Sequence, residues 1–196
     1  MSELVVRTLD ASTWAAYEAL LTKHNGIWGG CWCMEFQRDR QEKYNCVEEK
    51  KCDKRNLVLQ GKARAALVFH GDLAVGWCQF GPGRDLTAKR KFKRHYEKGI
   101  VTEPDWRITC FFVDRNYRGQ GIANIALDGA LDTIAEEGGG LVEAYPEITE
   151  GRTVKRTFIY LGTMAMFERR GFTKQRPVSM HNWVVTKQVE PRSKPE

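Results

Sequence analysis

Four residues near the middle of the chain combine types that suit the binding of a phosphate. Arg118, Gly119, Gln120 and Gly121 lie between an apolar run that ends at Val113 and an apolar helical pattern. The first N–H groups of a helix have no partner within it, and the helix dipole is positive there, so anions bind at such an end. Two glycines let a phosphate approach the backbone, and Arg118 adds a positive charge. The segment predicts a pyrophosphate site, with a loop that merely turns as the alternative.

The surrounding pattern predicts the strands and helices that position this segment. A strand over residues 106–113 precedes the glycines, and a helical pattern runs from 120 to 137. His70, Gly71 and Asp72 form the turn of a hairpin over residues 63–81. Asp10 or Ser12 is the expected N-cap of the first helix. The other elements are a strand at 3–9, helices at 10–24 and 38–61, a strand at 138–146, a helix at 158–172 and a strand at 181–188. The predicted order is β-α-α-β-β-β-α-β-α-β-β, an α/β fold.

Two signatures resemble one family of enzymes. The segment from Arg118 to Ala123, Arg-Gly-Gln-Gly-Ile-Ala, resembles the Q/R-x-x-G-x-G/A motif of the GNAT superfamily of acetyl-coenzyme A-dependent acyltransferases. The stretch from Met166 to Phe172, MFERRGF, looks like the second signature of that family, and the order of elements is similar over nearly the whole chain. The resemblance implies a GNAT-like, mixed and mostly antiparallel sheet with helices on both faces and splayed central strands. It implies one domain over residues 1–188, with a basic insert at 84–99 and a polar tail at 189–196.

The resemblance also implies where acetyl-coenzyme A binds. The cofactor is expected in the gap between the strand that ends at Val113 and the strand that carries Leu141 to Tyr145. A backbone N–H near a bulge at Phe112 and Val113 would stabilise the oxyanion that forms when an amine attacks the thioester. The expected cofactor-binding residues are Phe111, Phe112, Val113, Arg118, Gly119, Gln120, Gly121, Ile122, Ala123 and Asn124. The expected reaction is direct transfer of the acetyl group to an amine within a ternary complex.

The usual acid and base of the family are missing from their usual places. Phe167 replaces a frequent Tyr, Tyr160 replaces a frequent Asn, and Arg107 replaces the catalytic Glu of some members. One route is direct attack with water relaying the proton, and another is substitution by other residues, while binding without catalysis is the third. The candidate substitutes are Glu143, Tyr145, Glu35 and Tyr160. Glu143 and Tyr145 are two apart on one strand, so they share a face.

The stretch GGCWCMEF and the tryptophan before it have two interpretations, as part of the core or as a wall of the acceptor pocket. Trp28, Trp32 and Phe36 form either part of the core or an aromatic floor of the acceptor pocket, where Glu35 meets an amine. The family commonly walls its acceptor pocket with this part of the chain.

The six cysteines are expected to be reduced, because the chain is long and shows no secretory signal. Cys31 and Cys33 are too close to bridge easily. Together with Cys78 or Cys110 they are the alternative of a zinc site or a thiol-dependent sensor, although no His partner is evident and no metal is predicted. In the plainer interpretation, Cys78 and Cys110 are small buried residues on strands.

The net charge of +6 and the pI near 9.0 admit an anionic cofactor or a nucleic acid. Much of the charge lies in the insert at 84–99, so the main alternative function is a basic nucleic-acid-binding module, or an acetyltransferase that acts on a charged RNA. The basic and aromatic residues concerned are Lys89, Arg90, Lys91, Phe92, Lys93, Arg94 and Tyr96. No apolar run reaches the length of a membrane span. The expected setting is cytoplasmic, with a small-molecule or peptide amine as partner and a homodimer left open.

Overall fold

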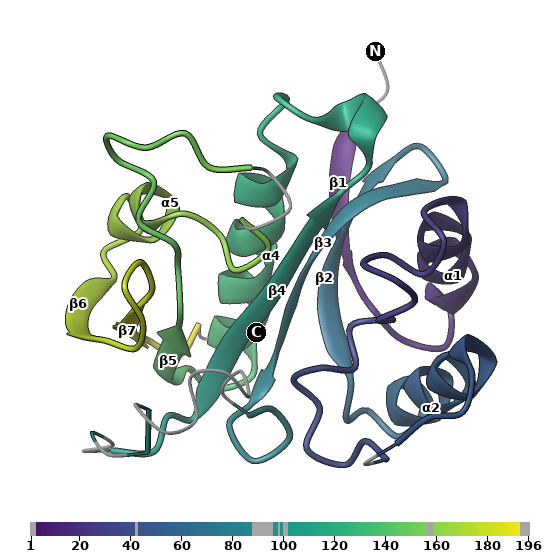
Figure 1. The fold of residues 1–196 in the computed structure, drawn as a ribbon, viewed down its shortest axis with the longest axis horizontal. Helices are drawn as coiled ribbons and strands as arrows, with labels where there is room; N and C mark the ends of the chain where they lie inside the picture. Colours follow the sequence, from purple (N-terminus) through teal and green to yellow (C-terminus); the bar gives the residue numbers. More distant parts are fainter. Residues whose placement is uncertain are drawn as a thin grey trace.

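The computed structural model describes residues 3–41, 43–87, 96, 97, 99, 102–155 and 159–192. Its centre is a seven-stranded sheet in the order β1-β2-β3-β4-β5-β7-β6 (Figure 1). The strands are β1 Leu4–Thr8, β2 Arg64–His70, β3 Leu73–Pro82, β4 Trp106–Val113, β5 Gly140–Ala144, β6 Thr173–Pro177 and β7 Trp183–Val189. Every neighbouring pair is antiparallel except β4 and β5, which run parallel. The mixed, mostly antiparallel sheet expected from the sequence is confirmed.

Helices cover both faces of the sheet (Figure 1). Helices α1, Trp14–Lys23, and α2, Val47–Leu59, lie on one face, while α4, Ile122–Glu136, and α5, Met164–Glu168, lie on the other. Successive residues of a strand point to opposite faces, so the strands feed two separate cores. Trp77 and Cys110 belong to the core under α1, and Cys78 and Phe111 belong to the core under α4.

The predicted order of strands and helices matches the observed order, and the hairpin turns at Gly71 and Asp72 as expected. The second helix is shorter than predicted. It begins at Val47 rather than near Arg38, because the backbone around Arg38 bonds elsewhere. The N–H of Arg38 donates to the carbonyl of Asp85, and the N–H of Thr87 donates to the carbonyl of Phe36. These tertiary bonds replace the helical bonds that the local pattern favours.

Three other boundaries also differ from the sequence expectation. The N-cap of α1 is Thr13, while Asp10 accepts hydrogen bonds from the backbone N–H groups of Ser12 and Thr13 one turn earlier. The helix expected over residues 158–172 is reduced to α5, because Gly162 turns the chain at a φ of 78° just before it. The tail assigned from residue 189 starts with the last residue of β7, and the N–H of Arg192 donates to the carbonyl of Ala135 in α4.

Most of the basic insert, including residues 88–95 with all of its predicted phosphate-binding lysines, lies outside the described residues. Tyr96, one of its two interleaved aromatic residues, is described and is 5% exposed. Its hydroxyl donates to Glu143 and accepts a hydrogen bond from Arg107. The ring of Tyr96 is therefore packed in the interior rather than presented to a nucleic acid.

Candidate functional site

The glycine segment forms an open cradle between β4 and α4. A short 3-10 turn, Arg115–Tyr117, leads from β4 into it, and Gly121 is the N-cap of α4. Gly119 and Gly121 have φ angles of 81° and 77°, a region that side chains with a Cβ rarely adopt. A Cβ placed on either glycine would meet nothing within 4 Å. The space above both residues is free, so the cradle fits the pyrophosphate that the motif predicts.

A cavity of about 580 Å³ continues from this cradle along the end of β4. Its lining includes every expected cofactor-binding residue except Gln120. The side-chain amide of Gln120 instead lies 3.5 Å from the carbonyl oxygen of Asn116. The fold thus brings together the backbone of β4 and the start of α4, as binding of a pantetheine arm and a pyrophosphate requires. The binding role of these residues stays a prediction.

An arginine of the second signature holds the first signature in place. Arg170 donates to the side-chain and backbone oxygens of Asn124, at 3.1 Å each. The same guanidinium forms an ion pair with Asp128 one turn later in α4. Since α4 begins at the cradle, these bonds fix the N-terminal turns of α4 relative to the segment that follows α5.

The two central strands pair briefly and then separate. Only Trp106 with Val142 and Arg107 with Glu143 are paired between β4 and β5. Farther along β4, the N–H of Phe111 donates to the carbonyl of Tyr160 at 2.7 Å. The expected splay is present, and the chain around Tyr160 lies beside its open end. A bulge was expected in β4 at Phe112 and Val113. The bulge lies instead at Thr109, which the pairing of β4 with β3 skips.

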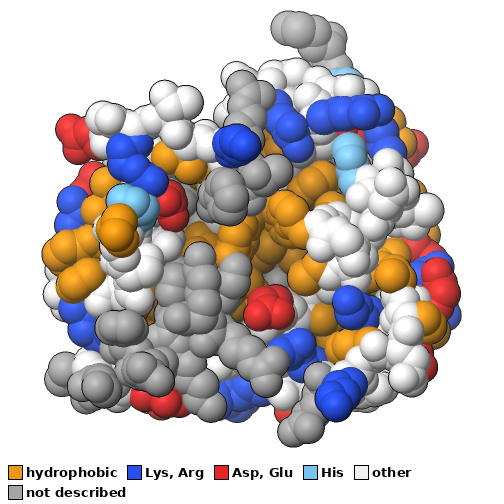
Figure 2. All heavy atoms as spheres, in the orientation of Figure 1, with side chains coloured by type: hydrophobic (Ala, Val, Ile, Leu, Met, Phe, Trp, Pro, Cys, Tyr) orange, Lys and Arg blue, Asp and Glu red, His pale blue; other side chains and the backbone are white. Residues whose placement is uncertain are grey.

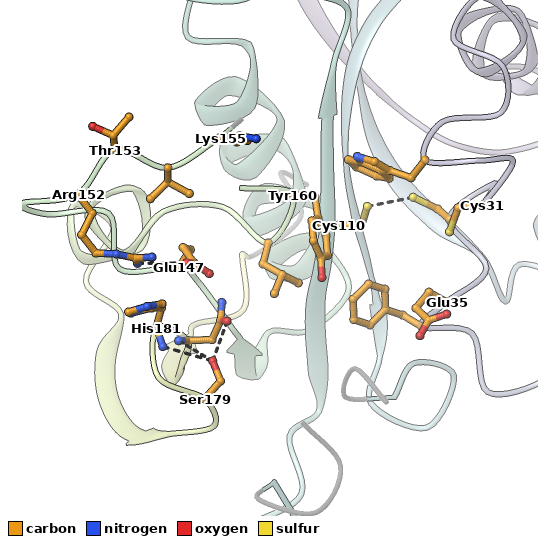
Figure 3. Close-up of a pocket in the computed structure, with 16 residues that line it drawn as sticks. Cys31, Glu35, Cys110, Glu147, Arg152, Thr153, Lys155, Tyr160, Ser179 and His181 are labelled. Carbon is orange, nitrogen blue, oxygen red and sulfur yellow. Dashed lines mark hydrogen bonds and ion pairs between the residues drawn. The ribbon is translucent and has the colours of Figure 1, made fainter. Parts of the chain in front are cut away.

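A second, larger cavity of about 870 Å³ opens on the other side of Tyr160. Its walls come from the loop between α1 and α2, from β4, and from the segments around residues 147–155 and 179–182. Figure 3 shows Glu35 and Cys31 on one wall and Glu147, Arg152 and His181 on the other. In Figure 2 hydrophobic side chains gather in the hollow at the middle of this face, with charged side chains around it.

Two aromatic residues form the boundary between the cavities. Trp28 and Tyr160 line both of them. Their ring centroids are 5.3 Å apart, and the ring of Trp28 also lies 6.0 Å from that of Phe112. A molecule in each cavity would therefore meet the other at this pair of rings.

The sequence left open whether the aromatic residues at positions 28–36 pack in the core or line the acceptor pocket, and the structure shows some of each. Trp28, Glu35 and Phe36 line the larger cavity, as expected of an acceptor wall. Trp32 is 3% exposed and packs in the core, with its ring 6.4 Å from that of Trp14. Glu35 remains partly accessible, with its carboxylate 4.0 Å from Arg40.

Glu143 and Tyr145 lie away from the lining of both cavities. Glu143 is 5% exposed, and its Oε1 accepts hydrogen bonds from the hydroxyls of Tyr96 and Tyr145 at 2.7 and 2.5 Å. Arg107 lies 3.3 Å away and also donates to the carbonyls of Gly83 and Leu86. Burial and the negative charge of Glu143 raise the pKa of Tyr145 well above its ordinary value. The group is a closed network that ties β4 to β5.

The cysteines on strands are buried, as the plainer interpretation of the sequence expected. Cys78 and Cys110 lie on opposite faces of the sheet, and Cys110 lies beside Cys33. Within the described residues no group of three or more His, Cys, Asp or Glu side chains has the arrangement of a metal site.

Several residues of the larger cavity were missed by the sequence reasoning. Glu147 is 8% exposed, and its carboxylate lies 3.3 Å from Arg152. Asn182 donates to the carbonyl of Tyr145 and accepts from Ser179, which fixes the neighbouring turn. The signal available was weak: Glu147 directly follows Pro146, at the end of the strand that borders the splay.

The sequence matches the model of the Acetyltransferase (GNAT) family over residues 17–172. The chain belongs to this family. Membership makes the protein an acyltransferase with acetyl-coenzyme A as its acyl donor. A search of curated proteins found no match.

Solved structures agree with the fold of this GNAT family member. A putative GNAT acetyltransferase from Desulfovibrio desulfuricans has a TM-score of 0.54 at 13% identity, covering 95% of this chain and 99% of its own. A putative acetyltransferase from Salmonella typhimurium, solved with its cofactor acetyl-CoA, has a TM-score of 0.53 at 13% identity and covers 98% of both chains. An acetyltransferase from Thermus thermophilus has a TM-score of 0.53 at 12% identity, covering 96% of this chain and 99% of its own. At these identities the likeness concerns the fold alone.

Proposed function

We propose that this protein transfers the acetyl group from acetyl-coenzyme A to an amine nitrogen of a small molecule or a peptide, with both substrates bound at once. The observation that carries the proposal is the meeting of two cavities at Trp28 and Tyr160. One cavity contains the glycine cradle, and the other presents the carboxylates of Glu35 and Glu147. Carboxylates attract an ammonium group, so an amine is the acceptor that suits the wall with Glu35, while Glu147 on the other wall is paired with Arg152.

The residues at the boundary suit the proton transfers that the reaction needs. Bound acetyl-coenzyme A supplies an activated thioester carbonyl. An amine attacks only when neutral, so a base must take its proton. Glu35 is partly accessible in the larger cavity, and we assign it this role, directly or through water. Tyr160 lines both cavities and would donate a proton to the leaving thiolate, while a backbone N–H at the open end of β4 would stabilise the oxyanion.

Glu143 and Tyr145 receive a different role in this proposal. Their hydrogen bonds are made to each other, to Arg107 and to Tyr96 inside the sheet. We infer that they hold β4 and β5 together at the base of the splay, so that the open ends of both strands keep their separation. They would act on the reaction only through that geometry.

Two measurements test the proposal in sequence. Calorimetric titration with acetyl-coenzyme A should show binding that Arg118→Ala weakens at least tenfold, because a charge beside the pyrophosphate is lost. Arg115→Ala is the matched control, since Arg115 is exposed and lies outside the lining of either cavity. Release of the coenzyme A thiol should then depend on added primary amines. Release that is equal without an amine, or that needs an alcohol instead, would contradict N-acetylation.

Within the described residues, no helix has the length and apolar character needed to cross a membrane.

A further inference from the structure

Two cysteines from distant parts of the sequence meet in the wall of the larger cavity. The Sγ atom of Cys33 lies 3.1 Å from the Sγ atom of Cys110, and both side chains are buried. Cys33 belongs to the loop between α1 and α2, while Cys110 belongs to β4 (Figure 3 marks the contact). The sulfur atoms of a disulfide are about 2.05 Å apart, so a movement of about 1 Å would join this pair.

A lysine of α2 is buried beside the pair. Lys54 is 1% exposed, and burial lowers the pKa of its ammonium group. The charges that raise this pKa again are those of Cys33, Cys110 and Cys31. A buried ammonium is costly unless an anion faces it. A thiolate on this cysteine pair would supply such an anion for Lys54.

The two cysteines differ in their readiness to ionise. Burial alone would raise the pKa of the Cys33 thiol, but the hydrogen bond with Cys110 and the charge of Lys54 oppose it, and the pKa is lowered overall. Burial and the neighbouring Cys33 raise the pKa of Cys110 well above its ordinary value. Cys33 is therefore the cysteine of the pair that ionises more readily. A thiolate is the nucleophilic form of cysteine.

The pair is reached from the larger cavity, whose lining includes both Cys33 and Cys110. Cys78 provides a contrast within the same molecule. It is equally buried, but it packs in the other core, and burial raises its pKa well above the ordinary value. Burial alone therefore makes a cysteine inert here, whereas Cys33 has a cation, a partner thiol and a route for small molecules.

We propose that Cys33 and Cys110 form a redox-active dithiol that a hydroperoxide entering the larger cavity oxidises to a disulfide. The thiolate of Cys33 attacks one oxygen of the hydroperoxide, the O–O bond breaks, and a sulfenic acid forms while hydroxide or alkoxide leaves. The sulfur of Cys110 then attacks the sulfur of the sulfenic acid. Its thiol proton and the departing hydroxyl form water, so two electrons pass from the two thiols to the peroxide.

The disulfide would affect both cavities, because it would join the loop between α1 and α2 to β4. Cys110 is followed in β4 by Phe111 and Phe112, which line the cofactor cavity. The loop that carries Cys33 also carries Trp28, which lines both cavities. A covalent bond between loop and strand fixes Trp28 relative to β4, so the oxidation state of the pair is coupled to the binding of acetyl-coenzyme A.

Peptide mapping of the whole protein tests the chemistry. After brief treatment with hydrogen peroxide and blocking of free thiols, trypsin should release peptide 24–38 joined to peptide 108–115, and dithiothreitol should separate them. Peptide 24–38 contains both Cys31 and Cys33, so Cys31→Ser is the matched control. The joined peptide should persist in Cys31→Ser and vanish in Cys33→Ser. Its absence from the wild-type protein, or its loss in Cys31→Ser, would overturn the proposal without requiring the Cys33 variant to fold.

Calorimetry tests the coupling to the site. The dissociation constant for acetyl-coenzyme A should differ at least threefold between the peroxide-treated and the reduced wild-type protein. In Cys110→Ser, which has no partner thiol, the same treatment should leave the constant unchanged, and Cys33 should instead become reactive to the sulfenic-acid reagent dimedone. Equal constants for the oxidised and reduced wild-type protein would overturn the coupling.

Discussion

The cavity that continues from the glycine cradle (the cofactor cavity) and the larger cavity, which we propose binds the acceptor (the acceptor cavity), differ in how the chain builds them. Apart from Trp28 and the residues 159 and 160, the residues that line the cofactor cavity all fall within one short segment, 111–124. The acceptor cavity is lined by residues from the loop between α1 and α2, from β4, and from three later segments. The first site is local in sequence, whereas the second exists only when distant segments meet.

This difference suggests that the two cavities depend on different features of the chain, the first on backbone conformation and the second on side chains. Positive glycine φ angles and free N–H groups at a helix start favour an anion, so the predicted pyrophosphate site depends on few other residues. The acceptor cavity depends on the side chains that each segment contributes, such as Glu35 from one wall and Glu147 from the other. The following variants test whether the two cavities respond independently.

The largest effect, on the free energy of unfolding, is expected at Glu143 in the buried network between β4 and β5. Glu143→Gln removes the charge that faces the buried Arg107, and leaving one member of a buried ion pair costs about 3 kcal/mol. Chemical denaturation should show this loss of unfolding free energy, while the affinity for acetyl-coenzyme A changes little. Normal stability combined with a large fall in kcat would instead support the catalytic role that the sequence suggested for Glu143.

The next effect should be confined to the cofactor cavity. Gly121→Val forces a β-branched residue to a φ of 77°, so the cradle must rearrange. We expect the dissociation constant for acetyl-coenzyme A to rise about 100-fold, which corresponds to about 2.7 kcal/mol. Gly61→Val is the control, since Gly61 has a φ of 69° and open space around it but lies outside both cavities. Equal losses of binding in the two variants would show that strain rather than the cradle is responsible.

A smaller effect should be confined to the acceptor cavity. Glu147→Gln removes a carboxylate from its wall, so kcat/KM for an amine should fall about tenfold, as expected for one charged hydrogen bond. Affinity for acetyl-coenzyme A should stay the same. Glu150→Gln, an exposed neighbour outside the cavity lining, should leave both quantities unchanged. A change in cofactor affinity would mean that the cavities are not independent.

The smallest effect, on the unfolding free energy, should come from Asp114, which lies between β4 and the 3-10 turn before the cradle. Burial raises the pKa of Asp114, but hydrogen bonds from Lys23 and the backbone of Asn116 outweigh it, so the pKa is lowered overall. A lowered pKa in the folded state stabilises the protein above the unfolded value, and this contribution is lost as the pH falls through the folded value. Unfolding free energy should therefore decline below about pH 4.

The variant Asp114→Asn provides the test of that carboxylate. It should lower the unfolding free energy at pH 7 by about 1 kcal/mol and make the acid decline shallower, because Lys23 is half exposed and the ion pair is partly screened. Asp72→Asn, at an exposed turn, serves as the control in the same thermal and acid titrations. A decline as steep as that of the wild-type protein would exclude Asp114 as its source.

The sequence predicted the fold better than the boundaries of its elements. The order of elements depends on apolar periodicity, which residues such as those of β4 carry locally. The second helix was predicted too long, because the bonds that hold Arg38 are made to Asp85, 47 residues away. Local patterns contain no information about such bonds.

The cofactor cradle could be read from the sequence because its chemistry resides in neighbouring residues. A helix start, two glycines and Arg118 predict an anion site without reference to the remainder of the chain, and the structure leaves open space above both glycines. The tertiary structure decided the rest. It placed Glu143 in a closed network, set Trp28 against Tyr160 at the boundary of two cavities, and brought Cys33 to Cys110. These contacts join residues on different elements, and their distances depend on how the loop between α1 and α2 packs on β4.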